Sequence, residues 1–476
     1  MRQKLQKFEQ FVQTLLPHEV RYLLAIQQFQ DLENLRLLEQ ILEQCQPGSH
    51  YRPFDTEIDK RKYSNLKKWI LTRLEAVDVD QQFDWLHQLE QKINLDDIAP
   101  DEEQQLLNVL ENFEPPYYWF NKLYELAQLY RRFLLIRLRY LDHERVMAFL
   151  EKWEPRYRFA LEVEDRLYEA TRDITSQYAF NDKDTRAWEP WLRQLFLDPD
   201  LDGHTRHQAV VRLTFLYINY REFEQLKDVY DELDAMYSRG ENYSRRLLVN
   251  YYANRLILHQ KLGNWDLAIA YGYLSLRHPT TERLQYLTNL AAVLLRQNRH
   301  KEVLNMMQEA IPLMRQSQNA HHKTGFVAFY LKALLDDGQT EQAERYADTF
   351  LRGNKQAVLG QQRWHIFFTL YLQVLIRQEK YNKVLSLVRK YKLMEREAEY
   401  RLRPVYLPSI HWYILVSQYK EGQINLDYLR QHLQTDMDYI RLNPHKRNLV
   451  MDLVKELYDH VPEAFAPFMD LPVMVQ

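Results

Sequence analysis

The sequence is poor in the residues that mark several common protein classes. Its single cysteine, Cys45, leaves no partner for an internal disulfide and rules out a multi-cysteine zinc site. The 476 residues include only 10 glycines and 17 prolines, which are too few turn-forming residues for a sheet-rich fold. Polar residues interrupt every apolar run, including residues 1–30, where a secretion signal would lie. We therefore expect a cytoplasmic protein without a membrane-spanning segment, in which Cys45 is a structural thiol.

The charge of the chain also lacks a strong bias. The 63 Lys and Arg residues nearly balance the 66 Asp and Glu residues, for a formal net charge of −3. Proteins that bind nucleic acid are usually strongly basic, so general binding of this kind is disfavoured. A local basic patch can still contact phosphates. The candidates are Lys60, Arg61, Lys62, Lys67 and Lys68, and the four arginines between residues 131 and 139. A solvated face or a domain contact is the simpler interpretation of both groups.

Catalytic and metal-binding motifs are missing from the sequence. It contains no HExxH, no phosphate loop and no nucleophile elbow. Residues 198–203 carry carboxylates at alternate positions, as in a calcium loop, but Ala209 stands where the bidentate glutamate is needed. We expect an acidic turn there that caps the next helix. His204 and His207 lie one helical turn apart without further ligands, so we predict no metal, no cofactor and no catalytic residue.

Helix-forming residues dominate the remainder of the chain. Leu, Gln, Glu, Arg and Lys abound, and no sustained alternation of apolar and polar residues indicates strands. The pattern predicts an all-α protein. Outside the region of repeats, the expected helices cover residues 3–16, 18–44, 59–76, 80–93, 100–112, 118–140, 143–152, 155–176, 408–420, 426–442 and 446–458.

A helix-turn-helix unit recurs five times in the second half of the chain. Its turn residues are Arg221, Gly263, Asn298, Gly338 and Glu379, at intervals of 42, 35, 40 and 41 residues. Five residues after each turn comes a small or aliphatic residue: Leu226, Ala268, Val303, Ala343 and Val384. Such periods are typical of helical solenoids, in which stacked helix pairs share a core. A further unit over residues 139–150 would turn near Leu141.

The clearest unit, residues 250–279, turns at Gly263 and ends before Pro279. Its second helix carries small residues at Ala268, Gly272 and Ser275. The unit resembles the tetratricopeptide repeat, and the resemblance covers roughly residues 202–392. It implies a right-handed α-solenoid of helix pairs. The predicted parts are an N-terminal helical head (1–180), a junction (181–204), the tetratricopeptide-like repeats (205–392) and C-terminal capping helices (393–476).

The resemblance also implies a groove lined by the first helix of each pair. In that family, an asparagine often stands at the sixth position of the repeat and bonds the backbone of an extended peptide. Nine residues before the turns, this sequence has Arg212, Asn254, Asn289, Phe329 and Leu370. Asn254 and Asn289 fit that role, and Arg212 could attract an acidic group, whereas Phe329 and Leu370 depart from the pattern and argue against a continuous peptide track. Further candidates for the concave face are Gln260, Arg296, Lys332 and Gln373.

These features favour a non-catalytic scaffold or regulatory subunit that binds a protein or peptide in its groove. Two alternatives remain from the sequence: a ligand-responsive sensor or transcription-type regulator, and an RNA-binding helical-repeat protein. The RNA alternative requires the two basic groups to form one exposed stripe. An enzyme with a dispersed site is a fourth possibility.

Overall fold

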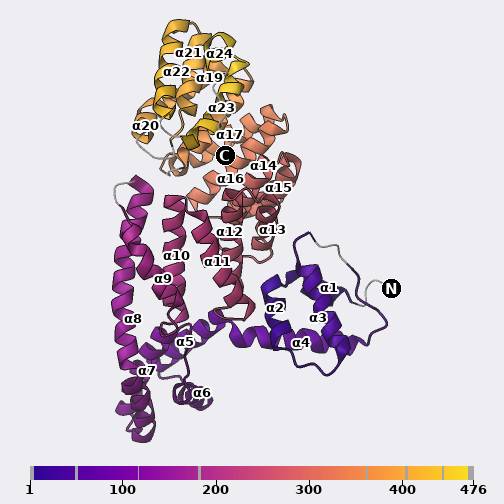
Figure 1. Cartoon of the computed structure of the whole chain (residues 1–476), viewed down its shortest axis with the longest axis vertical. Helices are drawn as coiled ribbons and strands as arrows, with labels where there is room; N and C mark the ends of the chain where they lie inside the picture. Colours follow the sequence, from indigo (N-terminus) through magenta and orange to yellow (C-terminus); the bar gives the residue numbers. More distant parts are fainter. Residues whose placement is uncertain are drawn as a thin grey trace. The chain divides into compact units, whose positions relative to one another are not determined.

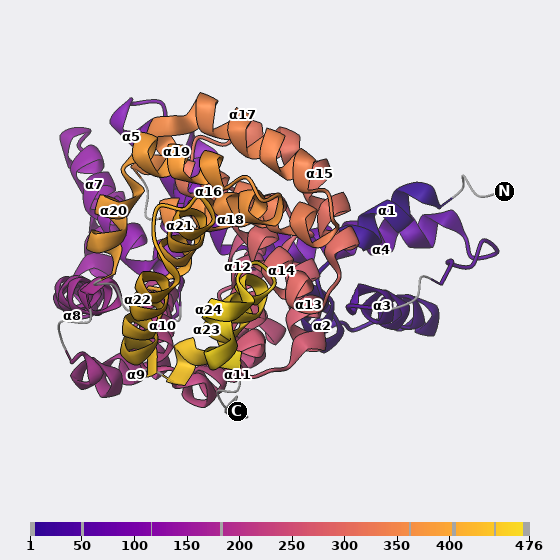
Figure 2. The same cartoon turned by 90° about the horizontal axis from the view of Figure 1, so that it is seen from above.

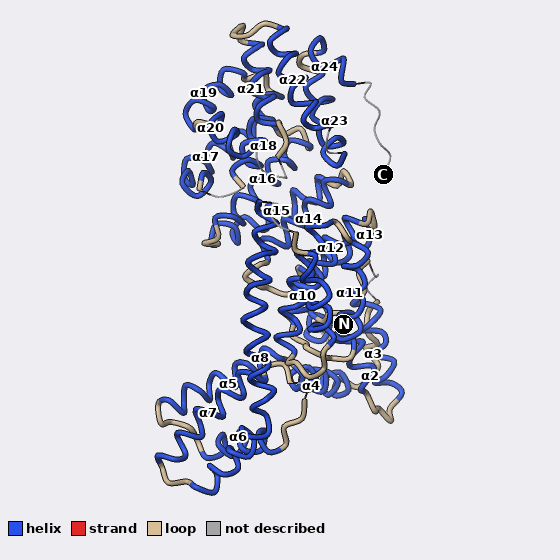
Figure 3. The backbone as a smooth tube through the Cα atoms, turned by 60° about the vertical axis from the view of Figure 1, so that its left-hand side comes forward, coloured by secondary structure: helices blue, strands red, loops and turns tan. Residues whose placement is uncertain are grey.

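The computed structural model describes residues 5–48, 52–115, 117–180, 184–360, 363–401, 406–441 and 444–469. These ranges contain 24 α-helices and no strand, and the structure is 80% helical (Figure 3). The predicted all-α class is therefore confirmed. Contacts within the chain divide it into two units, Met1–Thr280 and Thr281–Gln476.

The five predicted helix pairs are all present (Figures 1 and 2). The first unit contains the pairs α10 (Gly203–Tyr220) with α11 (Phe223–Ser238) and α12 (Arg245–Lys261) with α13 (Trp265–Ser275). The second unit contains α14 (Arg283–Arg296) with α15 (His300–Gln316), α16 (Ala320–Asp336) with α17 (Thr340–Leu359), and α18 (Trp364–Arg377) with α19 (Tyr381–Tyr391).

One backbone turn closes the first helix of every pair. The five predicted turn residues all have positive φ, between 55° and 77°. The N–H of the residue after each turn donates to the carbonyl five residues earlier, over 2.8–3.0 Å. This pattern is the Schellman motif, which satisfies carbonyl groups left over at a helix end. The aliphatic or small residue five positions after each turn is at most 1% exposed, so turn and core contact recur together.

In the second unit the helix pairs stack in chain order. Each first helix contacts the first helix of the next pair, from α14 through α16 and α18 to α21 (Ser409–Lys420). The second helices α15, α17 and α19 pack against the following first helix as well. This arrangement is that of a helical repeat. After α20 (Leu393–Tyr400) and α21, the chain continues with α22 (Leu426–Arg441), α23 (Pro444–Tyr458) and α24 (Pro462–Met469).

The first unit begins with helices that pack on the first repeat pairs. Its α2 (Pro17–Ile26) contacts α11, and Glu19 of α2 is fully buried. The Glu19 carboxylate accepts hydrogen bonds from Tyr243 Oη (2.5 Å) and Arg245 Nε (2.7 Å). The ring of His18 lies between Tyr252 Oη (2.7 Å) and Asp234 Oδ1 (2.8 Å). Because these buried polar groups satisfy one another, removing α2 would leave several unpaired.

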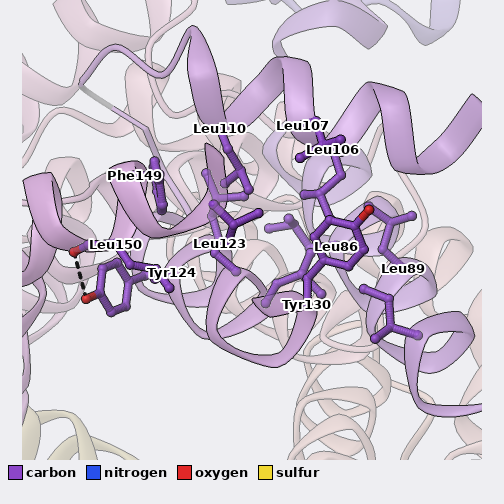
Figure 4. Packing of buried hydrophobic residues seen from close by; sticks show 14 of the residues in the cluster. Leu86, Leu89, Leu106, Leu107, Leu110, Leu123, Tyr124, Tyr130, Phe149 and Leu150 are labelled. Carbon is purple, nitrogen blue, oxygen red and sulfur yellow. Dashed lines mark hydrogen bonds between the residues drawn. The ribbon is translucent and has the colours of Figure 1, made fainter. Parts of the chain in front are cut away.

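Helices α5 (Val79–Asn94), α6 (Pro100–Glu111), α7 (Phe120–Ile136) and the start of α8 (Tyr140–Phe180) enclose an apolar core. Figure 4 shows leucines of α5 and α6 packed against Leu123 and Tyr130 of α7. Tyr124 donates to the carbonyl of Leu150, over 3.1 Å, and so fixes α7 to α8. The remaining helices of this unit are α1 (Gln6–Thr14), α3 (Leu32–Cys45), α4 (Lys60–Val77) and α9 (Glu189–Leu197).

Three local predictions are wrong. The expected helix over residues 18–44 is two helices, because Asp31 accepts from the N–H of Glu33 and starts α3 anew. The expected break at Pro155 is missing, and α8 continues through it. Pro155 and Glu151, whose carbonyl loses its partner, are both exposed, so water can satisfy that group. The turn expected near Leu141 lies at Leu138, where φ is +57°.

The shared turn predicts opposite effects for two substitutions in the second unit. Glu379→Gly should raise the free energy of unfolding by about 0.5–1 kcal/mol, because glycine adopts positive φ without strain. Gly338→Ala should lower it by about 1 kcal/mol, although the space around Gly338 is open. Urea denaturation of both variants measures the difference. Equal effects of the same sign would contradict a left-handed turn at these positions.

Candidate functional site

A cavity of about 480 Å³ lies on the first helices of the second unit. None of its lining residues comes from α15, α17 or α19, so it opens on the face of the stack away from the second helices. Its size is in the range of pockets that hold small ligands or a few peptide residues. The lining residues are Thr288, Asn289, Ala292, Gly325, Phe329, Arg363, His365, Ile366, Thr369, Tyr400, Leu407 and Ser409.

Two of the residues found by counting back from the turns line this cavity. Asn289 of α14 and Phe329 of α16 occupy equivalent places, nine residues before their left-handed turns. Asn289 is partly exposed, and its Oδ1 accepts from Gln285 Nε2 over 2.8 Å. Phe329 is half-buried and supplies an aromatic wall. The cavity therefore places an amide and an aromatic ring on neighbouring helices.

Arg363 brings a positive charge to the cavity, and sequence reasoning missed it. It precedes α18, and its Nη2 donates to Gln285 Oε1 of α14 over 3.0 Å. The guanidinium group lies directly over Gly325, where a Cβ atom would overlap Nη1 of Arg363. A glycine inside a helix costs stability and often marks such a close approach. Gly325 was thus the available sequence signal for this site.

The positive charge of Arg363 contributes to lowered pKa values of two histidines at the start of α16. Burial is the main reason that the pKa of His321 falls to about 4, and the nearby Arg363 adds to this effect. Burial likewise lowers the pKa of His322, whose Nε2 lies 3.5 Å from Glu282. Both imidazoles near Arg363 are therefore favoured in the neutral form.

A buried contact between a histidine and a glutamate connects the cavity to α20. His365 Nε2 lies 3.1 Å from Oε2 of Glu397, and the two residues are 7% and 4% exposed. The ring of Tyr400 stacks on His365, with 4.3 Å between the ring centroids. Because His365 and Tyr400 both line the cavity, a ligand there would contact the residues that hold α20 in place.

The other predicted groove residues of the second unit lie elsewhere. Arg296 is exposed near the end of α14, and Lys332 pairs with Asp336 at 2.8 Å. Gln373 is buried and donates to Glu456 of α23, so α23 covers this position. Leu370 is buried as well. Of the predicted groove residues, Asn289 lines the cavity, and its neighbour there is Phe329, which departs from the predicted asparagine pattern.

In the first unit, the predicted groove residues make local contacts. Arg212 is held against α8, where it donates to Thr171 Oγ1 (2.9 Å) and the carbonyl of Leu167 (3.3 Å). Asn254 donates to Asn250 Oδ1 over 3.1 Å, and both Asn254 and Gln260 are partly exposed.

The basic groups of the first unit are partly engaged in ion pairs. Lys62 pairs with Asp31 and Glu33, and Lys67 lies over the ring of Phe11. Lys60, Arg61 and Lys68 are exposed on α4. On and after α7, Arg137 pairs with Asp96, and Arg139 pairs with Glu103 and Asp142. These pairs reduce the charge that either group offers to a phosphate backbone.

The weaker chemical candidates have structural roles. Cys45 is buried, and burial raises the pKa of its thiol to about 12. Asp202 caps α10 through a 2.6 Å hydrogen bond from the N–H of Thr205, as the sequence predicts. The ring of His204 stacks on Trp119 at 4.7 Å. Burial lowers the pKa of His207 to about 4.

Within the described ranges, no three His, Cys, Asp or Glu side chains are grouped so that they could hold a metal ion. Nor is any helix in that part of the chain long and apolar enough to cross a membrane. Comparison with models of known protein families gives no match, and no curated protein matches the sequence.

Replacing Arg363 should change the titration of His321. In Arg363→Gln the nearby positive charge is lost, so the pKa of His321 should rise from about 4 while burial still holds it below 6.5. Heteronuclear NMR of the imidazole nitrogens measures this shift. Arg345→Gln, at an exposed position of α17, is the matched control and should leave His321 unchanged. An unchanged pKa in Arg363→Gln would contradict the placement of the guanidinium group.

Proposed function

We propose that the second unit binds an extended peptide segment of a partner protein in the cavity above α14, α16 and α18. In this role the chain is a non-catalytic scaffold or regulatory subunit. The observation that carries the proposal is that Asn289, Phe329 and Arg363, from three successive helix pairs, line one cavity. A single extended ligand can contact all three because the helices stack in order.

Each of the three residues would recognise a different part of the peptide. The amide of Asn289 can bond a backbone peptide group, and each such hydrogen bond contributes about 0.5–1.5 kcal/mol. Phe329 and Ile366 offer an apolar surface for one anchoring side chain. Arg363 would orient an acidic group beside them.

A ligand-responsive regulator is the second candidate. It is supported by the His365–Glu397 pair and the Tyr400 ring, which link the cavity to α20. A small anionic ligand that displaced these groups would alter the position of α20. This second candidate requires the protein to change shape when the ligand binds. Peptide binding by a scaffold does not require such a change.

Selection from a random peptide library tests the proposal with the full chain. Selected peptides are measured by fluorescence anisotropy against the wild type and Gly325→Ala. The added methyl group displaces the Arg363 side chain, whose far end is flexible, while alanine favours the helix. Binding should weaken by about tenfold or more, which is the loss of one central contact.

The matched control is Gly353→Ala in α17, where a Cβ atom meets nothing within 4 Å. This variant should bind the selected peptides as the wild type does. Equal binding by all three proteins would show that the peptides attach elsewhere and would reject the cavity as the site. Failure to select any peptide, with small anions still shifting the His321 signal, would favour the ligand-responsive alternative.

A further inference from the structure

Apolar side chains crowd the turn between α7 and α8 without being covered. Ile136, Leu138 and Leu141 are 78%, 68% and 79% exposed. Tyr140, Leu135 and Leu95, which ends α5, are also about half exposed or more. We call these six residues the α7–α8 tip. Six large apolar side chains in one place exceed the scattered exposure that is normal for a surface.

The fold itself does not account for Leu138. Its backbone has φ +57°, and the N–H of Arg139 donates to Leu134 in the same Schellman pattern as the repeat turns. The equivalent residues of the other helix pairs are glycine or polar: Arg221, Gly263, Asn298, Gly338, Glu379 and Gly422. Leucine disfavours positive φ, and here it gains no burial in return. An exposed leucine in a strained conformation suggests a functional contact.

The helices below the tip are well packed, so the exposure is not a result of a loose hairpin. Tyr130 and Leu134 of α7 and Val146 of α8 are fully buried. Tyr130 donates to Glu103 of α6, and the surrounding core is shown in Figure 4. The apolar tip is thus a distinct surface on a rigid support.

The charges beside the tip indicate what can cover it. Arg137 pairs with Asp96, while Arg139 pairs with Glu103 and Asp142. These pairs set two arginines against three carboxylates, so the charge beside the tip is close to neutral. A strongly charged partner would be met by an excess of one sign. A two-fold interface between copies, by contrast, places a surface against itself, and a nearly neutral surface does not repel its own copy.

The exposed area is also of the right size for this partner. The six side chains together expose on the order of 700 Å², close to the roughly 800 Å² that each partner buries in a standard interface. We propose that the α7–α8 tip is a self-association surface that binds the same surface of a second copy of this chain. Leu138 lies at its centre, and the neighbouring Arg–Asp pairs form the rim.

Sedimentation velocity of the full chain, over about a hundredfold range of concentration, tests the proposal. The wild type should form a dimer as the concentration rises. Leu138→Asn should weaken dimer formation by about tenfold or more, because a central apolar contact is lost. The same variant should raise the melting temperature, since asparagine tolerates positive φ better than leucine. If Leu138→Asn associates less but is more stable, the loss of the dimer is not caused by a folding defect.

Leu32→Asn is the matched control, because Leu32 is 65% exposed on α3, outside the tip. It should leave the dimer intact. A wild-type chain that stays monomeric throughout, or a dimer unaffected by Leu138→Asn, would overturn the proposal. Binding of a monomeric chain to phosphatidylcholine vesicles, lost in Leu138→Asn, would also overturn it and assign the tip to a lipid surface.

Discussion

The left-handed residue that ends the first helix of each pair is the constraint on which the structure depends. It allows the next N–H group to bond a carbonyl five residues back, and this bond reverses the chain within a few residues. The second helix then begins in a fixed direction, and its buried residue comes five positions after the turn. Because this closure is local, it can recur although the helices differ in length and sequence.

The cavity of the second unit follows from the same geometry. Residues at equal distances from their turns face the same side of the stack, which brings Asn289 and Phe329 to one surface. Gly325 then makes room for a guanidinium group that belongs to the next pair. The apolar tip of the first unit contains the same turn, but Leu138 occupies the left-handed position, where the other helix pairs have glycine or a polar residue. Both surfaces therefore lie on helix pairs that are joined by the same left-handed turn.

The sequence predicts these local features well because they need only neighbouring residues. All five turn positions and the buried residues that follow them are confirmed. Features that depend on the solvent or on distant segments are less predictable. Pro155 stays within α8 because it faces water. Gln373 is covered by α23, and Arg363 enters the cavity from the residue directly before α18. The tetratricopeptide pairing and the handedness of the stack remain predictions.

The central claim is that the face of α14, α16 and α18 receives the partner. Site-specific photo-crosslinking tests it most directly, with a photoreactive phenylalanine analogue placed at Phe329 in the cavity or at Arg345 on α17. A peptide bound as proposed would crosslink at position 329 and not at position 345, which belongs to a second helix. Crosslinking at position 345 without crosslinking at position 329 would place the partner on the opposite face and contradict the account.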